Sequence, residues 1–81
     1  MTSWFVYMVR CADNSFYTGV TTCIERRISE HNTSNKGARY TKARRPVELV
    51  YSETADSKSQ AFKREYAIKQ LTRTEKSHLI K

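Results

Sequence analysis

The chain has 81 residues, of which 38% are hydrophobic and 28% are charged, and its 15 Lys and Arg outnumber its 8 Asp and Glu. This length fits a single domain, residues 1–81, with a thin core, because so short a chain buries only about 60–65% of the surface that it exposes when unfolded. The composition suits a globular domain better than a disordered chain, and no apolar run reaches the roughly 18 residues of a membrane span.

The net charge of +7 favours a polyanionic partner, nucleic acid before a membrane, although a basic face can also be merely solvated. The first ten residues lack the basic segment and cleavage site of a signal peptide, so we expect a cytoplasmic protein. Cys11 and Cys23 are then reduced thiols. A zinc site of Cys11, Cys23, His31 and His78 would lack the usual paired spacing.

Residues 4–10 (WFVYMVR) and 16–20 (FYTGV) are rich in β-branched and aromatic residues and predict two strands. Residues 12–15 (ADNS) between them suit a tight turn, because Asp and Asn tolerate positive φ. The sequence therefore predicts a β-hairpin. The first strand has apolar residues on both faces and should be central: Phe5, Tyr7 and Val9 on one face, Trp4, Val6 and Met8 on the other.

Gly19 lies inside the second predicted strand, on the same face as Tyr17. A glycine there marks either a bulge or a place where another group approaches the backbone closely. Both interpretations stay open from the residues alone.

A helix over about 23–32 is predicted from a capping box of Thr22 and Glu25. At 100° per residue, Arg27 and His31 are neighbours at the border of its apolar face. An arginine in that place commonly covers apolar surface with its stem.

The segment 32–45 is poor in apolar residues and rich in Lys and Arg, with one aromatic, Tyr40. Basic residues interleaved with an aromatic suit a loop that follows phosphates and stacks a base, and a solvated loop is the alternative. A short helical turn is possible around 38–43. The basic residues are Lys36, Arg39, Lys42, Arg44 and Arg45.

Pro46 precedes an alternating strand over 47–53. Two more capping boxes, Ser57 with Gln60 and Thr72 with Glu75, predict helices at about 58–71 and 73–80.

On the first of these two helices Glu65 lies between Ala61 and Ile68, within an apolar stripe. A carboxylate there is costly to bury unless a cation meets it. The cation is either a Lys or Arg partner or a metal ion.

The sequence offers no Ser/His/Asp set, no glycine-rich phosphate loop and too few converging carboxylates for a two-metal nuclease. Hydrolysis of a phosphodiester needs a base, a cation for the phosphate charge and help for the leaving oxygen. A metal on Glu65, an arginine at Arg27 and a tyrosine would cover these roles.

The tripeptides Val6-Tyr7-Met8 and Tyr17-Thr18-Gly19 resemble the two signature tripeptides of the GIY-YIG nuclease superfamily. The resemblance spans nearly the whole chain and is closest to small stand-alone bacterial members. Val6 and Met8 depart from the first tripeptide. The later positions follow in order: Arg27, His31, Tyr40 and Glu65.

The resemblance implies an α/β (α+β) fold in which a three-stranded antiparallel sheet, the hairpin 4–10/16–20 plus strand 47–53, is flanked by helices. It also implies an endonuclease that cuts nucleic acid, DNA before RNA, with one Mg²⁺ or Mn²⁺ on Glu65. Tyr7 would take or relay a proton from the attacking water, and Arg27 would stabilise the phosphate charge. Tyr17 would position water or phosphate, and His31 and Tyr40 would assist.

A tyrosine of ordinary pKa, about 10, is a poor base at pH 7, and Arg27, Lys42 and the metal are the cations expected to lower it. The remaining candidates are nucleic-acid contacts: Gly19, Lys36, Arg39, Lys42, Arg44 and Arg45. Two alternatives stay open, a non-cleaving nucleic-acid-binding module and a protein-interaction domain for an acidic partner. The sequence does not address oligomeric state.

Overall fold

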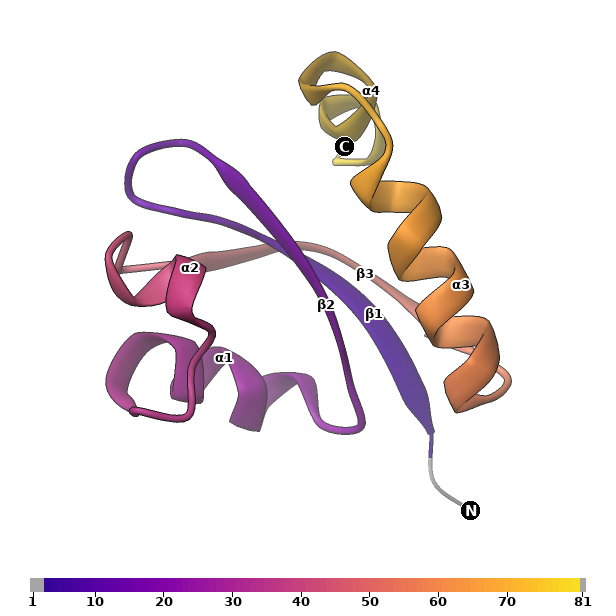
Figure 1. Cartoon of the computed structure of the whole chain (residues 1–81), viewed down its shortest axis with the longest axis horizontal. Helices are drawn as coiled ribbons and strands as arrows, with labels where there is room; N and C mark the ends of the chain where they lie inside the picture. The colour runs from indigo at the N-terminus through magenta and orange to yellow at the C-terminus, as the bar shows by residue number, and fades with distance from the viewer. Residues whose placement is uncertain (1–2, 81) are drawn as a thin grey trace.

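The computed structural model describes residues 3–80, which build a three-stranded sheet with helices on both faces (Figure 1). The α+β fold expected from the sequence is confirmed, with element bounds within one or two residues of those predicted. The elements are β1 (Trp4–Arg10), β2 (Phe16–Thr21), α1 (Ile24–Thr33), α2 (Arg39–Lys42), β3 (Glu48–Ala55), α3 (Lys58–Lys69) and α4 (Arg73–Leu79).

The sheet has the order β2-β1-β3 and both pairings are antiparallel, so β1 is central as predicted. The hairpin turn between β1 and β2 uses Asn14 at φ 69°, a conformation that Asn adopts more readily than most residues. Asp13 Oδ1 accepts a hydrogen bond from Ser15 N at 3.0 Å and fixes the turn. An Asx-type turn of this kind is what the Asp-Asn pair favours.

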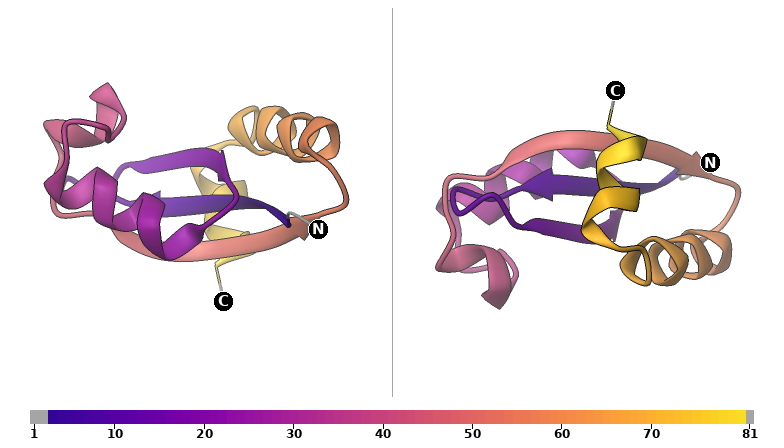
Figure 2. Two further views of the ribbon diagram at one scale, coloured as in Figure 1. Left: turned by 90° about the horizontal axis from the view of Figure 1, so that it is seen from below. Right: turned by 90° about the horizontal axis from the view of Figure 1, so that it is seen from above.

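Successive side chains along β1 point to opposite faces of the sheet and contribute to two separate cores, one on each face. Val6 and Met8 are fully buried with Ala61 and Ile68 of α3. Tyr7 and Val9 point the other way and pack with Cys11, Val47 and Ile28. Figures 1 and 2 show the result, with α1 and α2 on one face of the sheet and α3 and α4 on the other.

The helix starts differ in how they are capped. The capping box expected at Thr22 is wrong, because the N-cap of α1 is Cys23 and makes no side-chain cap bond. Ser57 caps α3 by accepting from Gln60 N, and Thr72 with Glu75 forms a full capping box on α4. The last two helices therefore begin where the sequence predicts.

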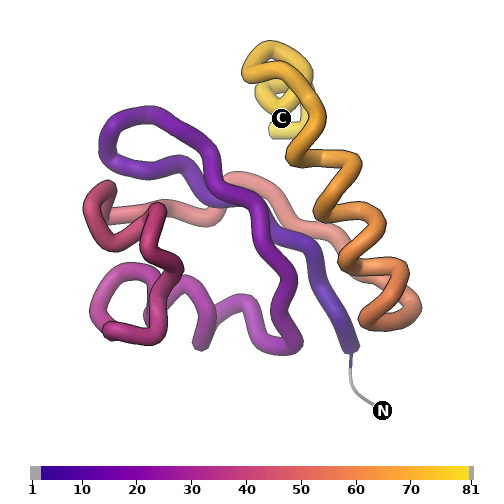
Figure 3. The backbone as a smooth tube through the Cα atoms, viewed as in Figure 1, coloured from indigo at the N-terminus to yellow at the C-terminus, as the bar shows by residue number. Residues whose placement is uncertain are grey.

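The edge strand β2 is the part of the sheet that positions the site. The short helix α2 and the helix α3 approach the sheet on its β2 side from opposite faces (Figure 2), and the backbone tube shows the same path of the chain in the view of Figure 1 (Figure 3). Side chains from either face can thus meet around the β2 edge. None of the helices formed by residues 3–80 has the length and apolar character that crossing a membrane requires.

Candidate active site

Tyr7 and Gly19 lie opposite each other in the β1–β2 register. The Tyr7 ring passes directly over Gly19, and a Cβ at this glycine would lie 2.5 Å from the Tyr7 hydroxyl oxygen. The β1–β2 pairing is continuous here, whereas the one register shift of β1 lies between Met8 and Val9 on the β3 side. Gly19 therefore marks a close approach, as one of the two interpretations held, and not a bulge.

The Tyr7 hydroxyl is held in a buried chain of hydrogen bonds. It lies 2.7 Å from Nε2 of His31, whose Nδ1 lies 2.8 Å from Oγ1 of Thr41. The Thr41 hydroxyl donates to the Ala38 carbonyl at 2.9 Å, which leaves Nδ1 of His31 as the donor to Thr41. In this tautomer Nε2 is free to accept the Tyr7 proton. The Ala38 amide N–H points at Nδ1 from 3.4 Å and would donate to it in the other tautomer. The shorter 2.8 Å bond to Thr41, whose own proton goes to the Ala38 carbonyl, favours the tautomer with the proton on Nδ1.

Burial controls the protonation of this pair, since Tyr7 is 1% exposed and His31 and Thr41 are fully buried. Burial raises the pKa of Tyr7 to about 12, against the opposing effect of Arg27. Burial also lowers the pKa of His31 to about 4, and the positive charge of Arg27 adds to that shift. Arg27 does lower the Tyr7 pKa, as expected, but desolvation by burial outweighs it, so the net shift is upward.

Arg27 lies on α1 one turn before His31, as predicted. Its Nη1 donates to Glu30 Oε1 at 2.9 Å and to the carbonyl of Lys36 at 2.8 Å. Burial opposes the charge, but hydrogen bonds to Glu30 and Tyr7 raise the pKa of Arg27. The guanidinium is therefore a fixed positive charge beside the Tyr7 hydroxyl.

Aromatic rings continue the site toward the surface. The Tyr17 ring packs edge-on against His31 at 5.4 Å between centroids and stacks on Tyr40 at 5.8 Å. The guanidinium of Arg44 lies over the Tyr40 ring, 3.9 Å from its centroid, and is held by Asp13 at 3.0 Å. Tyr40 remains 38% exposed, so the column ends in a ring that solvent reaches.

Glu65 reaches the site from the opposite face of the sheet. Its side chain is 18% exposed, and Oε2 lies 3.5 Å from Nζ of Lys69. The same ammonium lies 5.9 Å from the centroid of the Tyr17 ring. The negative charge of Glu65 contributes to the raised pKa of Tyr7. Glu65, Tyr17 and Tyr7 thus meet around the edge of β2.

The basic loop residues divide into outward and inward groups. Lys36, Arg39 and Lys42 are exposed at the surface beside α1 and α2. Arg45 instead turns inward, and its guanidinium donates to the carbonyls of Glu30, His31 and Ser34 at the end of α1. Arg45 therefore supports the segment that carries His31.

Comparison with known proteins decides the family. The model of the GIY-YIG catalytic domain matches residues 3–78. The chain belongs to the GIY-YIG family. A UPF0213 protein of Desulfotalea psychrophila is 65% identical over 79 residues, which cover 98% of this chain and 72% of that protein. One from Staphylococcus haemolyticus is 55% identical over 80 residues, which cover 99% and 96%.

Two structures solved by solution NMR are also similar. The UPF0213 protein BH0048 from Bacillus halodurans shares 44% identity at a TM-score of 0.59, over 95% of this chain and 81% of that one. The protein EF2693 from E. faecalis shares 41% identity at a TM-score of 0.63, over 96% and 82%. The GIY-YIG domain therefore has the nuclease-type fold of its family.

Two site residues of this GIY-YIG domain escaped sequence reasoning. Thr41 orients His31, and Glu30 holds Arg27. Glu30 is three residues from Arg27 on α1, a spacing at which opposite charges pair. The sequence could therefore have predicted this ion pair. Thr41 had no such signal, because its contact with His31 depends on the path of the loop between α1 and α2.

Proposed function

We propose that this GIY-YIG domain is an endonuclease that hydrolyses phosphodiester bonds of nucleic acid, with DNA as the favoured substrate. The observation that carries the proposal is the 2.7 Å hydrogen bond between Tyr7 and His31, buried beside Arg27. A buried tyrosine that is hydrogen-bonded to a neutral imidazole can pass its proton to that imidazole. A tyrosine with a purely structural role in the core would not need such a proton acceptor.

Tyr7 and His31 would act together as the base. At neutral pH the tyrosine is protonated and the imidazole is neutral, since the pKa values are raised to about 12 and lowered to about 4. As the Tyr7 oxygen takes a proton from the attacking water, its own proton moves along the hydrogen bond to Nε2 of His31. A phosphate that neutralises Arg27 removes one of the charges that lower the His31 pKa, so substrate binding makes this transfer easier.

Arg27 would stabilise the negative charge that develops on phosphate. Its planar fork can grip two phosphate oxygens, which a lysine at this position would not do. Glu30 and the Lys36 carbonyl hold the guanidinium by Nη1 before substrate arrives. Such preorganised charge costs no reorientation during the reaction.

Glu65 is the residue that would hold Mg²⁺ or Mn²⁺. Mg²⁺ keeps several waters and uses one or two carboxylates plus substrate phosphate, so one half-buried carboxylate suits it. Within the described part of the chain no three His, Cys, Asp or Glu side chains form a metal-binding group, and Glu65 would therefore act as the single protein ligand. A bound divalent ion supplies Lewis-acid stabilisation of the phosphate and the leaving oxygen.

The test is cleavage of labelled duplex, single-stranded, flap and branched DNA and of RNA, with Mg²⁺ or Mn²⁺. We expect Arg27→Ala to slow cleavage by about 10²–10³-fold, the usual cost of losing one charge-stabilising donor. Glu65→Gln should abolish the metal-dependent cleavage and spare binding, because it removes a ligand and no phosphate contact.

The matched control is Arg26→Ala, which removes an exposed arginine from the same helix. Cleavage that survives both Arg27→Ala and Glu65→Gln would contradict the proposed roles. A wild-type protein that binds these substrates and cuts none of them would be the non-cleaving module instead.

A further inference from the structure

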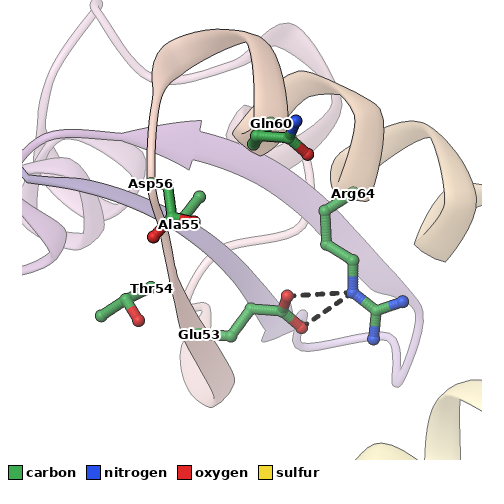
Figure 4. Close-up of a pocket in the computed structure, with 6 residues that line it drawn as sticks. All are labelled: Glu53, Thr54, Ala55, Asp56, Gln60 and Arg64. Atoms are coloured by element: carbon green, nitrogen blue, oxygen red, sulfur yellow. Dashed lines mark hydrogen bonds and ion pairs between the residues drawn. The ribbon is translucent and has the colours of Figure 1, made fainter.

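The two flanks of α3 differ in what they contact. One flank closes on β3, where Nε of Arg64 donates to both carboxylate oxygens of Glu53 at 3.0 and 2.9 Å (Figure 4). The small hollow of about 230 Å³ at this end of β3 is bordered by that ion pair. This flank is already satisfied by contacts within the domain.

The other flank carries two aromatic rings that the domain leaves uncovered. At 100° per residue, Lys58, Phe62, Tyr66 and Lys69 fall within an arc of about 80° on the helix surface. We call these four residues the outer flank of α3. Phe62 is 47% exposed and Tyr66 is 68% exposed, and the two are neighbours because they are four residues apart.

Positive charge borders these rings at both ends. Nζ of Lys58 lies 5.7 Å from the Trp4 ring centroid, and Nζ of Lys69 lies 3.5 Å from Glu65 and 5.9 Å from the Tyr17 ring centroid. Each ammonium therefore has a defined place on the surface. Stacking faces flanked by cations are the combination that binds single-stranded nucleic acid.

We propose that the outer flank of α3 binds an unpaired segment of the nucleic-acid substrate, with bases stacked on Phe62 and Tyr66 and phosphates beside Lys58 and Lys69. This inference rests on the proposed function and names the kind of substrate segment that the enzyme takes. Unlike the site residues, these rings contact no group that takes part in the proton relay.

Spacing favours unpaired bases over a duplex. Four helical residues rise about 6 Å, the separation of the two rings along α3. Successive nucleotides on one strand of B-DNA are only about 3.4 Å apart, and their faces are covered by neighbours. A flexible single strand can spread its bases to match the rings.

Position also links the flank to the active site. Glu65 lies only about 60° from Phe62 around α3, and Lys69 contacts both Glu65 and Tyr17. On the other side of the β2 edge, the Tyr40 ring is stacked on Tyr17 and covered by Arg44, so base stacking is assigned to the outer flank. A strand crossing the site at β2 would therefore meet the free aromatic faces of the outer flank next to the reacting phosphate.

The test is fluorescence anisotropy of a labelled 16-nucleotide strand, alone and as a duplex, in EDTA at fixed salt so that no cleavage intervenes. We expect the double variant Phe62→Ala/Tyr66→Ala to bind the single strand at least about twentyfold more weakly, since each stacked base contributes about five- to hundredfold. Duplex affinity should change less than threefold. The swap Phe62→Tyr/Tyr66→Phe, which keeps both rings, should bind like wild type.

Leu49→Ala is the matched control, because Leu49 is a 40% exposed apolar side chain on β3, away from this flank. Circular dichroism of every variant checks folding. Unchanged single-strand affinity in the alanine double variant, or equal losses for strand and duplex, would overturn the inference alone if wild type still cleaves. Wild type that binds neither oligonucleotide would overturn the proposed function as well. A wild-type dimer that the double variant converts to monomer would assign the flank to a second copy of the chain.

Discussion

The protonation of His31 is the residue-scale property on which the proposed chemistry depends. His31 has no exposed surface, and both of its ring nitrogens make short hydrogen bonds, to Tyr7 and Thr41. A neutral imidazole fits this arrangement, whereas an imidazolium would have to donate to Tyr7 as well. The folded domain therefore stabilises neutral His31, the form that can accept a proton. The free energy of unfolding should then depend on pH.

Folding stability should fall as pH falls below about 6.5. The unfolded chain binds a proton at His31 with a pKa of about 6.5, and the folded chain only at about 4. The stabilisation present above pH 6.5 is thus lost on acidification through pH 4, about 3 kcal/mol in all and about 2 kcal/mol between pH 7 and pH 5. Urea unfolding at pH 7, 6 and 5 measures the loss.

His31→Gln removes the titrating group and should flatten this dependence, while His78→Gln, at an exposed position on α4, should leave it unchanged. An equally steep dependence in His31→Gln would show that another group titrates. The same result would remove the buried neutral imidazole from the proposed relay.

At the scale of elements, the end of α1 determines where His31 and the basic loop lie. The last carbonyls of a helix have no partner within it, and at α1 Arg45 donates to one of these, the carbonyl of His31. The same guanidinium adds bonds to the carbonyls of Glu30 and Ser34, which also accept from the backbone amides of Ser34 and Gly37. A cation at a helix C-terminus also interacts favourably with the helix dipole. Arg45 thus fastens the segment before β3 to the helix that carries the site.

Arg45→Ala should lower the free energy of unfolding by about 1–3 kcal/mol, because it leaves the part-buried carbonyl of His31 unpaired and removes the bonds to Glu30 and Ser34. Arg39→Ala, at an exposed position on α2, should change it by less than about 0.5 kcal/mol. Urea unfolding gives both values, and hydrogen exchange should show faster amide exchange in the last turn of α1 for Arg45→Ala only. If the two variants had similar free energies of unfolding, the Arg45 contacts would contribute nothing measurable to stability.

Sequence reasoning succeeded for elements where one local rule acts alone. Alternation along β1 gave both cores, and Thr72 with Glu75 gave the start of α4. It failed at the start of α1, where Oγ1 of Thr21 accepts from Cys23 N at 3.1 Å and the Thr22 hydroxyl accepts from Arg26 instead of capping the helix. The inward turn of Arg45 depends on the fold, and no local pattern encodes it.

The same distinction explains the candidate site. Tyr7, Tyr17 and Gly19 lie together because strand register places them together, and register follows from the hairpin pattern. The direction of the Tyr7 pKa shift could not be predicted from the sequence, because it depends on how completely α1 closes over β1. The network through Thr41 required the loop path as well.

For the whole molecule, the net charge of +7 is spread over many lysines and arginines, and several of these already have partners within the domain. Arg10 pairs with Glu48, Arg44 with Asp13 and Arg64 with Glu53. Such pairs add less to the long-range attraction of phosphate than free cations do, because at a distance the neighbouring carboxylate offsets the charge. The exposed lysines of the basic loop are better placed for this role.

Lys42 should therefore contribute one phosphate contact. Lys42→Gln is expected to reduce the slope of log K against log salt by about 0.7 for single-stranded DNA or about 0.9 for duplex, because one fewer counterion is released on binding. Kd measured between 50 and 300 mM KCl in EDTA gives the slope. Lys76→Gln on α4 makes the same change in net charge away from the site and should keep the wild-type slope. If both variants reduce the slope equally, affinity follows the overall field of the protein, and if neither does, Lys42 lies outside the binding surface.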